Sequence, residues 1–353
     1  MARAPVALLF LVACAGPEPV DEGLPDGLLV LARPSAVGRL ARCLDAFSPS
    51  PAASALAAWV AGAAGCDRLF SGDGCVADSP LSSRLGDADV AFALPTPVGR
   101  VVGTATVGST GDVHAIAWSD RPAQPGAWGL LLPGEAPAGP GILSDATALL
   151  HARARPSGGI DVASLVPEQG QAADMFQLKS RLFGGAVLDG TWEFAVYPPP
   201  EGRTFPRLAL GLGVRTQQGG VAAMEGFIDA LARQWDVHRA PLTVGGSTGS
   251  CLPDLKVLPG FQPCYVATSS ALVAGWDARS VEEALAPAGD EAPASLVAVA
   301  HLDRFAGTDA SIAAAMDAAP VARSYPWGEL RIEGQEEQGR IRWDLSSRSG
   351  CGP

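Results

Sequence analysis

An uncharged run from Ala4 to Ala13, preceded by the single basic residue Arg3, most constrains what this chain can fold into. A positive charge followed by an apolar run that ends in small residues is the layout of a secretory signal. The run is far shorter than the ~20 residues that cross a bilayer as a helix, so a permanent membrane span is not expected. The rest of the chain is therefore predicted to fold outside the cytoplasm, where thiols become oxidised.

The end of this run carries a more specific pattern, Leu11-Val12-Ala13-Cys14. It resembles the lipobox of bacterial lipoproteins, in which the cysteine thiol receives diacylglycerol and becomes the mature N-terminus. The resemblance covers only the start of the chain. It implies that residues 1–13 are a lipoprotein signal peptide and that Cys14 is the site of lipid attachment. The alternative is plain secretion, with Cys14 incidental.

The same resemblance implies how and where the protein is held. Stable membrane anchoring takes two signals, such as two acyl chains, and the three acyl chains of such a lipoprotein exceed this requirement. Ala15, in place of Asp after the cysteine, implies outer-membrane delivery by the sorting rule of enteric bacteria. We therefore expect a lipid-anchored outer-membrane protein that faces the periplasm or the cell surface. Residues 14–26, rich in Pro, Gly and acidic residues, are predicted to be an acylated N-terminus and a flexible tether.

The other cysteines are even in number, which in an oxidising compartment predicts disulfides. Two pairings close short, turn-rich loops, Cys66 with Cys75 and Cys251 with Cys264. Closing a loop of this size contributes up to about 3 kcal/mol. Elimination then pairs Cys43 with Cys351.

The charge balance limits the kinds of partner. The chain has 25 Lys and Arg residues against 37 Asp and Glu residues, a formal net charge of −12. An acidic surface argues against nucleic acid and against charge-driven docking on anionic lipid. The expected partners are the membrane, through the acyl chains, and another envelope protein.

The periodicity predicts an α+β fold of two similar modules, each a mostly antiparallel sheet with helices packed on one face. The first module covers residues 27–135, and the second covers residues 145–353 and ends in a β-hairpin. Apolar residues at period two between Pro- and Gly-rich turns predict the strands. The strongest helix pattern runs from Gly219 to Trp235, with apolar residues at helical spacing.

Four short matches recur in the same order in both halves, which suggests a diverged internal duplication. They are Ala32-Arg33-Pro34-Ser35 with Ala154-Arg155-Pro156-Ser157, Arg68-Leu69-Phe70 with Arg181-Leu182-Phe183, Pro95-x-Pro97-x-Gly99-Arg100 with Pro198-x-Pro200-x-Gly202-Arg203, and Asp112-Val113-His114 with Asp236-Val237-His238. The layout of residues 150–345, with Ser270-Ala271-Leu272-Val273-Ala274 before a helix starting at Ser280, also resembles a bacterial domain family of unknown function. That resemblance implies a fold and no activity.

One motif suggests catalysis, Gly245-Gly246-Ser247-Thr248-Gly249, which matches the Gly-x-Ser-x-Gly pattern of serine hydrolases. Asp277 and His301 follow in hydrolase order. However, Cys251-Leu252-Pro253 leaves no room for the helix that such a serine needs. A Gly-rich hairpin turn is the preferred interpretation, and no catalytic residue is assigned.

No cofactor or metal is predicted either. Gly211-x-Gly213 lacks the further residues of a nucleotide-binding loop. The four histidines, at positions 114, 151, 238 and 301, show no metal-ligand spacing. The leading hypothesis is thus a cell-envelope lipoprotein that acts as a non-enzymatic binding or structural module. The alternatives are a serine hydrolase that uses Ser247 and a carrier of apolar ligands.

Overall fold

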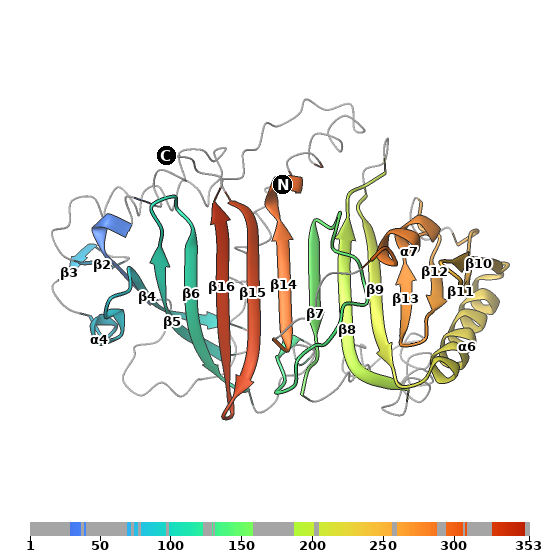
Figure 1. The fold of residues 1–353 in the computed structure, drawn as a ribbon, viewed down its shortest axis with the longest axis horizontal. Helices are drawn as coiled ribbons and strands as arrows, with labels where there is room; N and C mark the ends of the chain where they lie inside the picture. The colour runs from blue at the N-terminus through green and yellow to red at the C-terminus, as the bar shows by residue number, and fades with distance from the viewer. Residues whose placement is uncertain are drawn as a thin grey trace. The chain divides into compact units, whose positions relative to one another are not determined.

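The computed structural model describes the chain in segments, and strands dominate them (Figure 1). The described residues are 29–36, 39, 69–71, 74–76, 79–96, 99–122, 129, 131–157, 187–200, 205–255, 260–287, 294–305, 308 and 327–349. The chain divides into two compact units. The first unit contains Met1–Pro125 with Val299–Pro353, and the second contains Gly126–Ala298.

The prediction of two similar α+β modules is wrong, because the described residues are mostly strand. Only two helices among them have seven or more residues, α6 (Gln217–Trp235) and α7 (Ala278–Ala284), and both belong to the second unit. In the first unit, α4 (Ser82–Leu85) is the helix whose bounds are described. The two units therefore do not share one plan of a sheet with helices on one face.

The repeated sequence matches do not occupy equivalent places throughout. Pro95–Arg100 and Pro198–Arg203 both join consecutive antiparallel strands. Asp112, in contrast, immediately precedes a strand, whereas Asp236 ends α6 with a left-handed φ of 49°. The shared order of the matches is thus not explained by two copies of one strand and helix plan.

The first unit is an antiparallel sheet in the order β15-β16-β6-β5-β4-β1-β2-β3. These strands are β1 (Leu29–Ala32), β2 (Leu69–Ser71), β3 (Gly74–Val76), β4 (Val90–Thr96), β5 (Gly99–Val107), β6 (Val113–Asp120), β15 (Trp327–Glu337) and β16 (Arg340–Ser349). Strand β16 pairs with β6, so the C-terminal hairpin, which the sequence analysis places in residues 145–353, completes the sheet of the N-terminal strands.

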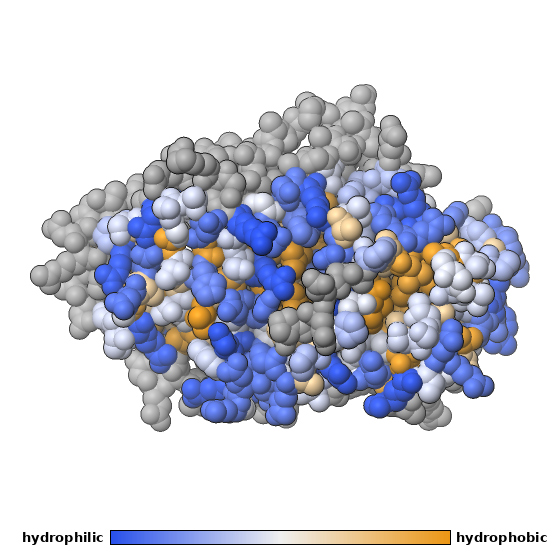
Figure 2. Space-filling view, viewed as in Figure 1, coloured by the Kyte–Doolittle hydropathy of each residue, from blue (hydrophilic) through white to orange (hydrophobic). Residues whose placement is uncertain are grey.

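Alternation along these strands gives the first unit a packed region and a hydrophilic region. Leu31, Ala91, Ala93 and Val102 form a buried cluster with Leu81 and Leu85, the N-cap and the last residue of α4. In the hairpin, Ile341 is fully buried, and Trp343 Nε1 donates a hydrogen bond of 2.9 Å to Ser119 Oγ of β6. Figure 2 shows mostly hydrophilic residues around the tip of the β15–β16 hairpin, as the alternating charges predict.

The second unit is an antiparallel sheet in the order β10-β11-β12-β13-β9-β8-β7. These strands are β7 (Leu150–Ala154), β8 (Leu188–Tyr197), β9 (Arg207–Val214), β10 (Ala240–Val244), β11 (Ser247–Cys251), β12 (Cys264–Ala267) and β13 (Ala271–Gly275). The last strand, β14 (Leu296–His301), spans the boundary between the two units.

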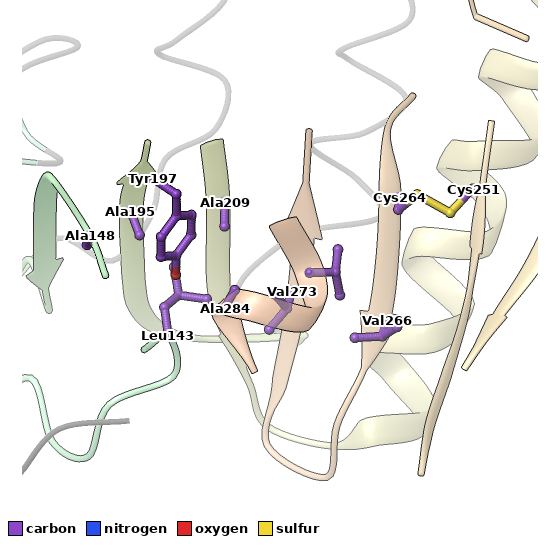
Figure 3. Packing of buried hydrophobic residues seen from close by; sticks show 11 residues of the cluster. Leu143, Ala148, Ala195, Tyr197, Ala209, Cys251, Cys264, Val266, Val273 and Ala284 are labelled. Atoms are coloured by element: carbon purple, nitrogen blue, oxygen red, sulfur yellow. A yellow bond between two sulfur atoms is a disulfide. The ribbon is translucent and has the colours of Figure 1, made fainter. Parts of the chain in front are cut away.

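Helices α6 and α7 pack on opposite faces of this sheet. Tyr265, Ala267 and Leu272 point to α6, where they meet Met224 and Ile228. The intervening residues of the sheet point to α7, as Figure 3 shows for Val266 and Val273 beside Ala284 of the helix. The two faces of the sheet are therefore covered by different helices.

Local capping explains where both helices begin. The Thr216 side chain accepts a hydrogen bond from the Gly219 N–H, so α6 begins two residues before the predicted Gly219. Asp277 caps α7, which begins at Ala278 rather than at the predicted Ser280. Within the described residues, no helix combines the length and apolarity needed to cross a membrane.

Several predictions fall on residues that the structure does not describe. They are the signal peptide of residues 1–13, Cys14 and the tether of residues 14–26, and the cysteines at positions 43, 66 and 351.

Candidate functional site

The Gly-x-Ser-x-Gly motif forms the turn of a β-hairpin. Gly245 and Gly246 have φ angles of 55° and 83°, which glycine adopts without strain. Ser247 follows them as the first residue of β11 and lies opposite Val244 of β10. This is the geometry of a tight two-residue hairpin, in which the serine leads into a strand rather than into a helix.

The other two members of the hydrolase hypothesis have partners of their own. Asp277 Oδ1 accepts hydrogen bonds from the Ser280 N–H at 2.7 Å and from the Ser280 hydroxyl at 2.6 Å. Its carboxylate is therefore engaged in starting α7. His301 Nδ1 lies 3.7 Å from Glu329 Oε2.

The cysteines that are described are oxidised. Cys251 and Cys264 form a disulfide, the pairing predicted from their short loop, and they lie opposite each other on β11 and β12 (Figure 3). Cys75 is also disulfide-bonded, while Cys66, its predicted partner, lies outside the described residues.

Polar clusters in the described part of the chain do not form a metal site. Within it, no group of three or more His, Cys, Asp or Glu side chains has the geometry to hold a metal ion. Two histidines each meet one carboxylate near the surface, His114 with Asp344 at 3.0 Å and His238 with Asp254.

The most concentrated chemistry in the second unit is a buried polar row on β7 and β8. Glu193 is 0% exposed, and His151 and Arg153 are 3% and 6% exposed. Arg153 lies directly opposite Glu193, and His151 is two residues away on the same face. Glu193 Oε1 lies 2.5 Å from His151 Nε2 and 3.4 Å from Arg153 Nε. A buried carboxylate thus has a cationic partner, without which its burial would be costly.

The loop before β7 closes over this polar row. The Ile142 N–H donates to Glu193 Oε2 at 2.5 Å, and Arg153 Nη1 donates to the Gly139 carbonyl at 2.7 Å. Gly211 of β9 lies opposite Glu193, and a Cβ there would stand 2.7 Å from Ile142 Cγ2. The loop reaches the sheet because position 211 has no side chain.

A second ionic contact ties the same face to α7. Arg207 Nη2, buried at the start of β9, lies 2.5 Å from Glu283 Oε2 of α7. Glu283 Oε1 in turn accepts a hydrogen bond of 2.5 Å from the Thr147 hydroxyl of the loop. One carboxylate therefore joins a strand, a helix and the loop.

Tyr197, opposite Arg207, completes the covered face. Its hydroxyl donates to the Ser144 carbonyl at 2.8 Å, and in Figure 3 its ring points toward Leu143. Burial chiefly, and then the negative charges of Glu283 and Glu193, raise the pKa of this hydroxyl above its ordinary value. The folded protein thus favours the neutral phenol form of Tyr197.

The opposite face of the same three strands is apolar and less covered. We call it the β7–β9 apolar surface, and it consists of Leu150, Ala152, Phe194, Val196, Leu208 and Leu210. Five of these residues are partly exposed, and Leu210 is 40% exposed. The described contacts of α6 with the sheet lie on β9, β12 and β13, beside this surface.

These strands therefore reverse the usual arrangement of a half-exposed sheet. Antiparallel sheets with one wet face normally turn their polar residues to water and their apolar residues to the core. Here the charged residues are on the covered face and the apolar residues on the more exposed one.

Sequence analysis missed both features. The histidines were judged by metal-ligand spacing alone. The useful signal was a charge at alternate positions of otherwise apolar strands, in Leu150-His151-Ala152-Arg153-Ala154 and in Trp192-Glu193-Phe194. The same alternation is also the pattern of a strand with one wet face, so the sequence alone does not show that these charges are buried.

Comparison with known proteins adds no relative from which a role can be carried over. No protein-family model matches this chain, and neither a curated protein nor a solved structure matches it.

Proposed function

We propose that this protein is a lipid-anchored protein of the bacterial outer membrane whose folded part is a non-enzymatic binding module. Its second unit binds an apolar partner through the β7–β9 apolar surface. The lipobox-like Leu11-Val12-Ala13-Cys14 supports the anchoring half of this proposal, and the six residues of that surface support the binding half.

The observation that carries the proposal is the reversed sheet of β7, β8 and β9. Glu193 and Arg153 are buried on the covered face, where they form an ion pair, while Leu210 on the other face is 40% exposed. Apolar area left in water is a cost to a folded protein that does not use it. A partner that covers this face recovers that free energy.

The buried polar row supports a binding role over a catalytic one. A histidine beside a carboxylate is a common acid–base pair, but catalysis requires that substrate reach it. His151 and Glu193 are buried, and the loop donates the Ile142 N–H to the same carboxylate. A serine hydrolase that uses Ser247 has less support, because that residue follows a hairpin turn.

The anchor is tested on the mature protein. Mass spectrometry of the N-terminal peptide is expected to find an acylated cysteine at position 14, and cell fractionation is expected to place the protein in the outer membrane. A mature chain that begins elsewhere, or that begins at Cys14 without fatty acid, would refute the anchored half of the proposal.

The binding half is tested by photocrosslinking in cells. A benzophenone amino acid is introduced at Leu210 and, as a matched control, at Thr243, an exposed residue of β10 on the same face of the sheet. After irradiation, we expect a covalent adduct at position 210, with either a protein or a smaller apolar molecule, and none at position 243. Equal adduct yields at both positions, or none at either, would refute a binding role for this surface.

A further inference from the structure

The occupant of the β7–β9 apolar surface can be narrowed by its chemistry. We propose that it is the hydrocarbon chain of a membrane lipid, bound as a separate molecule. This inference rests on the proposed binding function and specifies its ligand class.

The first reason is the absence of charge at all six positions of the surface. Two rows run across the three strands, Leu150–Val196–Leu208 and Ala152–Phe194–Leu210. None of these side chains carries a charge or a hydrogen-bonding group. The six side chains therefore match a hydrocarbon chain, and the next row on the same face, Ala154–Trp192–Leu212, adds the indole N–H of Trp192.

The second reason is area. With strands about 4.8 Å apart and residues on one face about 7 Å apart, three strands and two rows cover roughly 200 Å². A stable protein–protein interface buries about 800 Å² on each partner. A second copy of this chain or another folded protein therefore needs far more surface than these strands offer, whereas one acyl chain does not.

The third reason is the formal net charge of −12. A chain this acidic repels the anionic headgroups of a membrane surface rather than docking on them. When the contact is made through an acyl chain alone, the charged headgroup stays away from the apolar surface, so this repulsion does not oppose binding. Helix α6 beside the surface extends the apolar contact, because Leu212 and Ala274 on the same sheet face pack with α6.

The test uses the full-length acylated protein in cells supplied with a fatty acid that carries both a diazirine and an alkyne. One sample is irradiated in cells, and another is irradiated only after purification in detergent. Crosslinked peptides are then enriched through the alkyne and identified by mass spectrometry. We expect the peptides of β8 and β9 to carry the probe lipid, without the acylated N-terminal peptide attached, in both samples, because a separately bound lipid survives purification.

Paired variants assign the label to the surface. Leu210→Glu places a carboxylate among apolar contacts and is expected to reduce labelling of β8 and β9 at least about tenfold. Thr243→Glu, at an exposed position of β10, is expected to leave labelling unchanged. Circular dichroism melts of both variants check that each remains folded. Equal labelling of wild-type protein and a folded Leu210→Glu variant would overturn the assignment.

The outcomes separate this inference from the proposed function. Labelling only before extraction indicates contact with the bilayer rather than a bound chain, and it would overturn the inference. A protein adduct at position 210 would also overturn it, while leaving a binding function in place. Loss of the fatty acid on the N-terminal peptide bears on the anchor alone.

Discussion

Glu193→Gln is expected to destabilise the second unit strongly. Gln has nearly the same volume, so the substitution leaves no cavity, and its carbonyl still accepts the Ile142 N–H. It removes the only negative charge within 3.4 Å of the buried Arg153 Nε among the described ion pairs. Breaking a buried pair by neutralising one partner costs about 3–5 kcal/mol. A domain with a total stability of about 5–15 kcal/mol loses a large part of it.

The measurement is urea unfolding of the purified protein, followed by tryptophan fluorescence and extrapolated linearly to water. Arg153→Gln and the double variant complete a cycle, and the double variant is expected to lose at least about 1 kcal/mol less than the sum of the two single losses. Glu333→Gln is the matched control. Its partner Arg331 lies 2.6 Å away, but both side chains are partly exposed, so that change costs about 1 kcal/mol or less. A loss as small as that of the control, or strict additivity in the cycle, would refute the reasoning.

Four further predictions concern single residues. Gly211→Ala is expected to cost about 1–3 kcal/mol in urea unfolding, because the new Cβ meets Ile142 Cγ2; unchanged stability would mean that the loop does not approach the sheet there. Asp277→Ala is expected to cost about 1 kcal/mol of stability, because α7 loses its N-terminal cap. Ser247→Ala is expected to leave stability unchanged, and neither the wild-type protein nor this variant is expected to react with a fluorophosphonate probe. Tyr197 has a raised pKa in the folded state, so the unfolded chain releases this proton first and stability falls as the pH rises through the ordinary tyrosine range. Spectrophotometric titration is expected to show one of the three tyrosines resisting ionisation until the protein unfolds.

The strands were largely predictable, because a period of two is a local property. Burial alternates in this way along β5 (Gly99–Val107) and β9 (Arg207–Val214). Turn chemistry was equally local, and it correctly favoured a hairpin at Gly245-Gly246 over a nucleophile elbow. Both features depend only on residues that are neighbours in the sequence, so they can be predicted from one sequence.

The arrangement of the strands was not predictable, because pairing between distant segments leaves no local trace. Nothing near Trp343 indicates that β16 pairs with β6. The α+β assignment failed for a related reason. Short matches such as Asp112-Val113-His114 and Asp236-Val237-His238 were read as equivalent positions, yet one leads into a strand and the other leaves a helix.

The candidate site was missed because charge was assigned to the surface by default. In β7 and β8 the pairing of Arg153 with Glu193 reverses that rule, and only the register between the strands reveals it. Once these two residues are known to be buried, the alternation places Ala152 and Phe194 on the other face.

The pairing of β16 with β6 also bears on the order in which the chain can fold. The Trp343 and Ser119 side chains that meet there are separated by 224 positions. A chain made from its N-terminus presents β6 with an open edge long before β16 is available, and open edges invite association with other chains. The pairing of β6 with β16 is then expected to be a slow step in folding, because contacts between residues far apart in the sequence form slowly.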